Sequence, residues 1–124
     1  MTARYLWLNA VLFIAFAAWC ALRAEPTAQA LGFTAMDAGG RTEYLAVYGG
    51  LQLGLGLLFA WTARAPDRLR FGLLLALALY GPIVALRGIG LLRYGPVPLL
   101  TQVTAAGEAL MLLLALALWF ARRG

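Results

Sequence analysis

The chain has 124 residues, of which 64% are hydrophobic and only 12% are charged. Because soluble domains carry about 25% charged residues, this composition excludes an ordinary water-soluble globule and predicts one integral membrane domain over residues 1–124. The net charge of +5 comes from arginine, without any lysine or histidine. The arginines are scattered over the loops, which argues against a nucleic-acid partner and suits contact with membrane lipids.

The residue types also argue against metal, cofactor and catalytic chemistry. Cys20 is the only cysteine, so neither an intrachain disulfide nor a CxxC pair can form. Without histidine, few ligands are left for zinc, copper or haem. We therefore predict no metal, no cofactor and no catalytic residue. An enzyme that uses Glu108 as an acid or base is the less favoured alternative.

The first hydrophobic run covers residues 5–22, which is nearly long enough to span a membrane core of ~30 Å. Trp7 and Trp19 lie near its two ends, as interfacial anchors do. A signal peptide is the alternative, but Leu22-Arg23-Ala24 is a poor cleavage site. We interpret the run as a retained membrane helix.

The longest connection covers residues 23–42 and is predicted to be an outer loop. Pro26 is expected to stop the first helix. The apolar spacing over residues 27–33 predicts a short interfacial helix. Asp37-Ala38-Gly39-Gly40 has the composition of a turn.

The second run, residues 43–63, has polar and small residues where lipid contact would favour large apolar ones. On a helix, residues four apart share a face, so one stripe is expected from Tyr44, Tyr48, Gln52 and Gly56. Such a stripe must face protein, water or a ligand. Close helix packing, within the bundle or in a homo-oligomer, is predicted for Gly49, Gly50, Gly54 and Gly56. Room for a ligand beside the backbone is the alternative.

The third and fourth runs cover residues 71–92 and 99–121. A Gly81-Pro82 pair near the centre of the third run is expected to kink that helix. The short connection over residues 64–70 predicts that the second and third runs are antiparallel neighbours. The sequence therefore predicts an all-α fold, a four-transmembrane-helix up-down-up-down bundle.

The arginines divide unequally between the two ends of this bundle. The end that holds both termini carries six: Arg4, Arg64, Arg68, Arg70, Arg122 and Arg123. The opposite end carries three: Arg23, Arg41 and Arg93. Because cytoplasmic loops are enriched in basic residues, we expect the N- and C-termini to be cytoplasmic.

Arg87 and Glu108 lie inside the third and fourth runs and are predicted to pair. From the helical rise they differ in depth by roughly 6 Å, within reach of an arginine side chain. An isolated charge at the membrane centre costs about 2.5–3.5 kcal/mol, which a bidentate contact would offset. Further polar groups are expected at overlapping depths: Tyr48, Gln52, Tyr80 and Thr104. Asn9 is expected nearer the cytoplasmic end, outside this cluster.

Three interpretations of the polar cluster remain open. One is a polar-floored pocket in the outer half of the bundle, where Arg87 meets an anionic or carbonyl group. Another is a structural ion pair that fixes helix register. The third is that Arg87 extends to the membrane interface without a partner.

Several segments carry a family resemblance: residues 43–56, Ala85-Leu86-Arg87, residues 96–100 and Glu108. In these the chain resembles the small bacterial four-helix membrane proteins catalogued as domain of unknown function 4345. The resemblance implies four spans and a bacterial inner (cytoplasmic) membrane, and it implies no activity. In size and number of spans the chain is also similar to DoxX-like proteins.

The favoured function is a non-enzymatic membrane protein that binds a lipid-like or small amphipathic ligand between its helices. One alternative is a structural or accessory subunit of a larger membrane complex. Another is a small oligomeric transporter with Arg87 and Glu108 on its path. The expected partners are membrane lipids, a second copy of the chain or another membrane protein.

Overall fold

The computed structural model describes residues 1–122, and this part of the chain is helical without strands. Four of its helices are long and apolar enough to cross a membrane. The prediction of an all-helical chain with four candidate spans is confirmed, and Arg123 lies outside the described residues. In chain order the elements are α1 (Thr2–Leu22), α2 (Ala24–Ala30), α3 (Ala38–Tyr44), the π-helix η1 (Leu45–Leu51), α4 (Gln52–Ala63), the 3₁₀-helix η2 (Pro66–Arg68), α5 (Leu69–Tyr94) and α6 (Leu99–Ala121).

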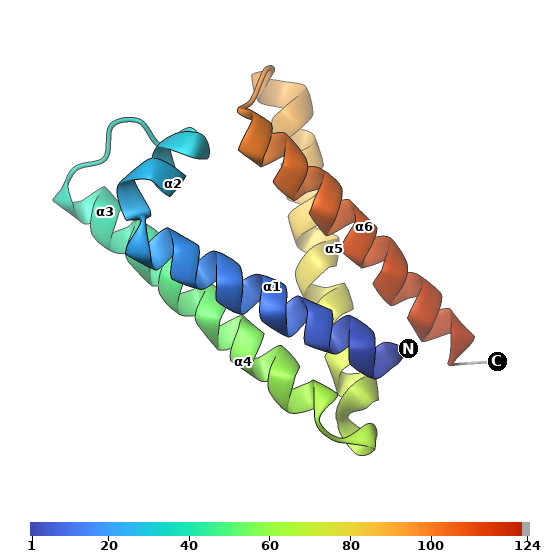
Figure 1. Ribbon diagram of the computed structural model, residues 1–124. Coiled ribbons are helices and arrows are strands. Elements are labelled where there is room, and N and C mark those ends of the chain that lie inside the picture. Colours follow the sequence, from blue (N-terminus) through green and yellow to red (C-terminus); the bar gives the residue numbers. More distant parts are fainter. Residues whose placement is uncertain (123–124) are drawn as a thin grey trace.

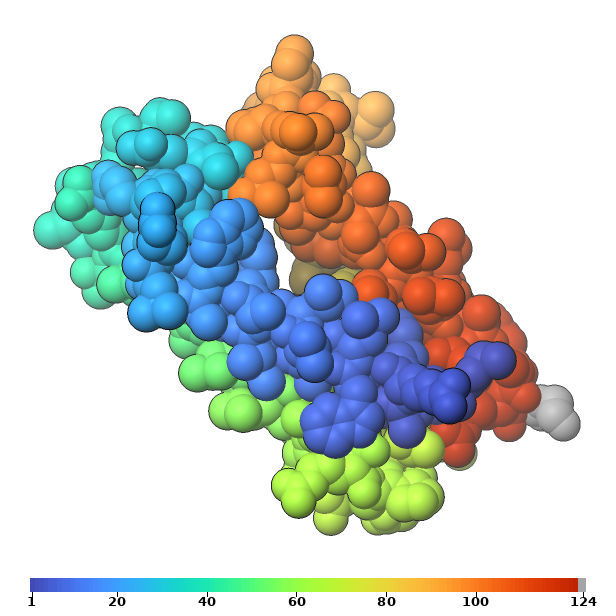
Figure 2. All heavy atoms as spheres, in the orientation of Figure 1, coloured from blue at the N-terminus to red at the C-terminus, as the bar shows by residue number. Residues whose placement is uncertain are grey.

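The long helices are arranged in two pairs (Figure 1). In one pair α1 packs along η1 and α4, and in the other α5 packs along α6. The two pairs lie close together near the start of α1 and diverge toward the opposite end of the molecule (Figure 1). Figure 2 shows the hollow that this leaves between α1 and α6, with α5 behind it.

Large apolar side chains cover the outside of all four long helices. Examples that are about half exposed or more are Leu12, Leu57, Leu86 and Leu113. Contiguous apolar surface of this extent is rare on soluble monomers and marks contact with a membrane or a partner. Together with the four candidate spans, it is compatible with a multi-pass membrane protein.

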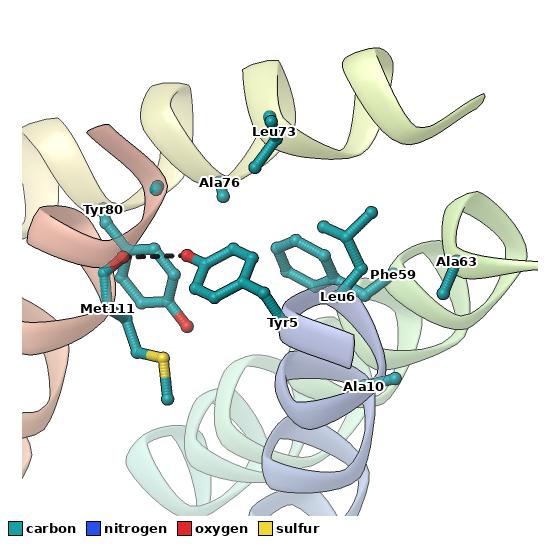
Figure 3. Packing of buried hydrophobic residues seen from close by; sticks show 10 residues of the cluster. Tyr5, Leu6, Ala10, Phe59, Ala63, Leu73, Ala76, Tyr80 and Met111 are labelled. Atoms are coloured by element: carbon teal, nitrogen blue, oxygen red, sulfur yellow. Dashed lines mark hydrogen bonds between the residues drawn. The ribbon is translucent and has the colours of Figure 1, made fainter. Parts of the chain in front are cut away.

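The main core lies where the two helix pairs meet (Figure 3). Leu6 of α1, Phe59 of α4 and Leu73 of α5 are fully buried there. Gly72 brings α5 close to the other pair, because a Cβ at this position would lie 2.5 Å from Leu6 Cδ1 and 2.8 Å from Thr62 Oγ1. A side chain at residue 72 would therefore push the two pairs apart.

The predicted glycine packing is found at two of the four positions. A Cβ at Gly56 would lie 2.6 Å from Ile14 Cγ1, so α4 and α1 touch closely there, and a Cβ at Gly49 would lie 3.5 Å from Ala21. Gly50 and Gly54 have no atom within 4 Å of that position. Gly50 and Gly54 therefore have no close neighbour at the Cβ position within the described residues. Their contact with a second copy stays a prediction.

The connection after α1 differs from the expectation in three details. α1 ends at Leu22 and Pro26 lies inside α2, where the first turn of a helix tolerates proline. The short helix lies three residues earlier than expected, at Ala24–Ala30. The expected turn at residues 37–40 is instead the start of α3, because the Asp37 carboxylate accepts a hydrogen bond of 2.8 Å from the Gly40 N–H and caps the helix.

The second and third spans are longer than predicted. The second is one continuous helical segment, Ala38–Ala63, interrupted in its hydrogen-bonding pattern by η1. π-helical turns are rare and frequently occur at functional sites. α5 passes through Pro82 without a break in the helix.

Candidate functional site

A cavity of about 270 Å³ lies between the two helix pairs. Its apolar lining comes from three side chains of α1, one residue after α2, and one residue each of α5 and α6: Leu12, Phe13, Phe16, Leu31, Ile83 and Met111. The cavity is half open, and the hollow between α1 and α6 in Figure 2 lies over it. Both helices are candidate membrane spans.

The polar part of the lining is the set of residues that the sequence singled out. All six predicted polar residues line this one cavity: Tyr48, Gln52, Tyr80, Arg87, Thr104 and Glu108. They come from η1, α4, α5 and α6. The depth of each residue along its predicted helix was thus sufficient to group these six residues correctly. Gly107 also lines the cavity and was missed, because a glycine in a run of small apolar residues has no distinguishing pattern.

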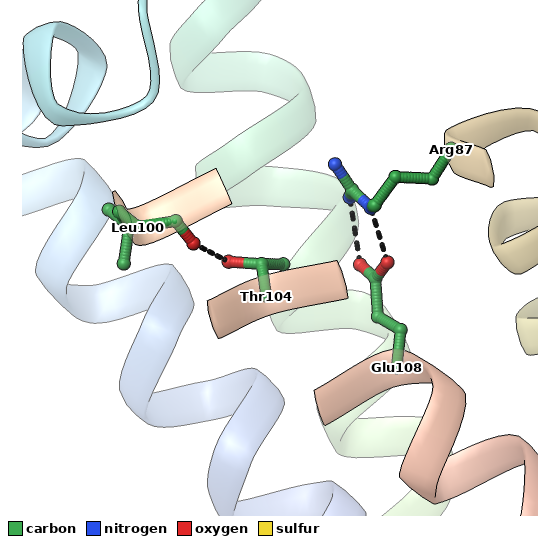
Figure 4. A network of polar contacts seen from close by, with 4 residues as sticks. All are labelled: Arg87, Leu100, Thr104 and Glu108. Carbon is green, nitrogen blue, oxygen red and sulfur yellow. Dashed lines mark hydrogen bonds and ion pairs between the residues drawn. The ribbon is translucent and has the colours of Figure 1, made fainter. Parts of the chain in front are cut away.

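Arg87 and Glu108 form a bidentate ion pair across α5 and α6 (Figure 4). Arg87 Nε donates to Glu108 Oε2 at 2.5 Å, and Arg87 Nη2 donates to Glu108 Oε1 at 2.8 Å. The side chains are 31% and 16% exposed, respectively. This fork-to-fork geometry is the strong form of the interaction, and it neutralises both charges within the site. The interpretation in which Arg87 has no partner is therefore wrong.

Tyr48 and Gln52 differ from the other polar residues of the lining. Within residues 1–122 no hydrogen bond is made by the Tyr48 hydroxyl or the Gln52 amide. Thr104, by contrast, donates its hydroxyl to the Leu100 carbonyl of its own helix at 2.7 Å (Figure 4). The hydroxyl and the amide are therefore the groups that can bond to a ligand without breaking a bond in the protein.

A second polar network lies beside the cavity and includes Asn9. As expected, Asn9 is not part of the lining, but it is bonded to Tyr80, which is. Tyr80 donates its hydroxyl to Asn9 Oδ1, and Asn9 Nδ2 donates to the Tyr5 carbonyl at 2.9 Å. The Tyr5 hydroxyl donates to the Met111 carbonyl at 2.8 Å (Figure 3). The network ties α1 to α5 and α6. Tyr5 was missed, because tyrosines near a span end are usually interfacial.

An aromatic cluster fixes α2 over η1. The hydroxyls of Tyr44 and Thr27 are hydrogen-bonded at 2.8 Å, and Tyr44 stacks on Tyr48 with ring centroids 4.7 Å apart. Phe33 packs edge-on against both tyrosines. The predicted stripe therefore divides: Tyr44 contacts α2, Tyr48 and Gln52 line the cavity, and Gly56 contacts α1.

The loop after α2 reaches the other helix pair at the wide end of the molecule. Gly32 has a φ of +98°, a backbone conformation that favours glycine, and a Cβ there would lie 3.6 Å from Pro98 Cγ. Pro98 directly precedes α6. This contact bridges the two pairs at one end.

The arrangement has features that suit the binding of a small molecule. Among the described residues no group of histidine, cysteine, aspartate and glutamate side chains could hold a metal ion. The carboxylate of Glu108 is already held at both oxygens by Arg87. What the cavity offers is an apolar wall beside fixed hydrogen-bonding groups, which suits a molecule with a polar and an apolar part.

No family model, curated protein or solved structure matches the chain. The resemblance to the four-helix family described above therefore stays a prediction. The candidate site is judged by its geometry alone.

Proposed function

We propose that this chain is an inner-membrane protein of a bacterium that binds a lipid-like or small amphipathic ligand in the cavity between its helix pairs. The observation that carries the proposal is the convergence of six polar side chains in a cavity with apolar walls. Such groups are unfavourable in a membrane interior unless they pair or bind something. In this proposal the four spans run up-down-up-down, with both termini in the cytoplasm.

The position of the opening supports a lipid-like ligand. Lipids beside the protein contact α1 and α6, whose outward side chains include Val11, Leu110 and Leu113. A ligand can move from the bilayer into the hollow between these helices with its apolar part in lipid throughout. The polar part then reaches Arg87, Tyr48 and Gln52 without crossing the headgroup region.

Native mass spectrometry from a mild detergent tests the proposal. We expect the purified protein to carry a lipid-sized adduct, and Arg87→Ala to lose it. A protein without any adduct, across several mild detergents, would argue against ligand binding. A stoichiometric protein partner in the same spectrum would support the accessory-subunit alternative instead.

One observation favours that alternative as a second candidate. α6 is the least buried of the four candidate spans, with 11% of its most apolar window buried. Gly50 and Gly54 also leave an open face on the second span. A membrane partner could pack on either surface, and cross-linking in the membrane before extraction would capture it.

A further inference from the structure

We propose that the cavity selects an uncharged single-chain amphiphile, such as a long-chain alcohol, over a fatty acid anion or an alkyl ammonium ion. This inference rests on the proposed function and names the class of ligand. The sequence left either an anionic or a carbonyl group as the partner of Arg87. This inference excludes the anionic group and keeps an uncharged one.

The first argument is the charge balance of the cavity. Among residues 1–122, Arg87 and Glu108 are the only charged residues in its lining, and they neutralise each other through two hydrogen bonds. An anionic head would have to share Arg87 with Glu108, leaving one unbalanced negative charge in a region of low dielectric. A cationic head would leave one unbalanced positive charge. Both are unfavourable, because an unpaired charge within a membrane is costly.

The second argument is the set of hydrogen-bonding groups that remain. Arg87 uses Nε and Nη2 on Glu108, while Nη1 takes part in neither bond. Tyr48 can donate or accept, and Gln52 can do both at its amide. A hydroxyl head also donates and accepts, so it can bond to this set while the ion pair stays intact.

The third argument concerns size and entry. A cavity of about 270 Å³ is at the lower edge of the range for ligand sites, which is roughly 300–1,000 Å³. It has room for a head and the first part of one chain, not for the two chains and phosphate of a phospholipid. The rest of the chain can extend through the hollow between α1 and α6 into the bilayer (Figure 2).

Photolabelling in lipid nanodiscs tests the selection. Three probes share a diazirine-bearing dodecyl chain and differ in the head: dodecanol, dodecanoic acid and dodecylamine. The acid is assayed at about pH 9 and the amine at about pH 7, where each is ionised, and dodecanol is assayed at both pH values. Labelled peptides are mapped by mass spectrometry. We expect dodecanol to label the cavity-lining segments of α1 and α6 at least about tenfold more than either charged probe.

Charge-switch variants test whether the ion pair sets the preference. Glu108→Gln leaves Arg87 unbalanced, so the preference should move to dodecanoate. Arg87→Gln leaves Glu108 unbalanced, so the preference should move to dodecylamine. The double variant Arg87→Met/Glu108→Met keeps the site neutral and apolar, and it should still reject both ions. The double variant and the wild-type ranking keep the test decisive if a single variant fails to fold.

The outcomes separate this inference from the proposed function. Equal labelling of the cavity by all three probes, or a preference of the wild type for either ion, overturns the selection of a neutral head while ligand binding stands. Labelling by all three probes that is confined to lipid-facing positions and absent from the cavity overturns both. Dodecanol labelling that is blocked by excess unlabelled dodecanol and not by dodecanoate supports the inference.

Discussion

At the scale of single residues, two separate polar networks join different helices. Arg87 and Glu108 satisfy each other across α5 and α6. Tyr80 and Asn9 satisfy each other across α5 and α1. A polar group buried with its partner contributes little net stability, but removing one partner leaves the other buried and unsatisfied. Each network is therefore expected to tolerate the loss of both members better than the loss of one.

The ion pair gives the first prediction. Glu108→Leu should destabilise the protein more than Arg87→Leu/Glu108→Leu does, because only the single variant leaves an uncompensated charge in the membrane. We expect a difference of at least about 1 kcal/mol, since the partial exposure of both side chains reduces the usual 3–5 kcal/mol. Unfolding in mixed micelles measures it. Equal stabilities of the two variants would show that the pair is energetically unimportant.

The Tyr80 hydroxyl gives the second prediction. Tyr80→Phe should lower the free energy of unfolding by about 1–3 kcal/mol, because the buried Asn9 Oδ1 loses its donor. Tyr94→Phe is the matched control, since Tyr94 is 76% exposed and should change stability little. If the two substitutions have the same effect in one detergent, the buried network contributes nothing measurable.

At the scale of the elements, the arrangement depends on where helices approach closely. α1 and α4 touch at Gly56, and the two pairs meet at Gly72. Farther from the start of α1 the two pairs diverge (Figure 1), and the cavity lies between them. Gly72 therefore sets how far the pairs are separated at their closest point, and with it the geometry of the cavity above.

Gly72 gives the third prediction. Gly72→Ala should destabilise the protein by about 1–3 kcal/mol, because its methyl group would overlap Leu6 and Thr62. Gly88→Ala on the same helix is the control, since nothing lies within 4 Å of a Cβ there and alanine favours helix. Thermal unfolding should separate the two variants in sign. A neutral Gly72→Ala would mean that the helices can move apart at no cost.

Hydropathy and helical rise were enough to predict the four spans and the six polar residues around the cavity. The position of a residue along the helix axis can be predicted because each helical residue adds the same rise. The sequence predicted the second and third runs as neighbours, whereas the main packing joins α1 with α4 and α5 with α6. The main pairs could not be predicted, because leucine and alanine cover all faces and the contacts depend on the shape of particular side chains. Gly72 and Gly50 look alike in sequence, yet only Gly72 is in a tight contact. Asn9 is the one strongly polar residue in the run 5–22. Its presence there was a sign that a buried polar partner exists.

At the scale of the whole molecule, one end carries arginines together with tryptophans. The Arg68 guanidinium lies 4.3 Å from the ring centroid of Trp61, and that of Arg70 lies 5.3 Å from the ring of Trp119. Tryptophan and arginine at span ends are typical of the headgroup level of a membrane. The start of α1 and the end of α6 lie toward the same end of the molecule (Figure 1). This grouping supports the proposal that this end is cytoplasmic.

Cysteine labelling tests the proposed orientation and gives the fourth prediction. In a Cys20→Ala background, which removes the single native thiol, single cysteines replace Thr34 in the loop after α2 or Asp67 in η2. A membrane-impermeant maleimide should label Thr34→Cys in intact cells, and Asp67→Cys only after permeabilisation. Labelling in the reverse order would invert the topology.

The central claim is that the cavity between the helix pairs holds a ligand, and a cavity-filling substitution tests it most directly. Gly107 lines the cavity with nothing within 4 Å of a Cβ, so the side chain of Gly107→Leu starts in open space beside the cavity. Gly90→Leu on α5 is the control, because Gly90 is equally unobstructed and lies outside the lining. In native mass spectrometry we predict a lipid adduct on the wild type and on Gly90→Leu, and its loss from Gly107→Leu at unchanged thermal stability. An adduct of the same mass and occupancy on Gly107→Leu would contradict the claim.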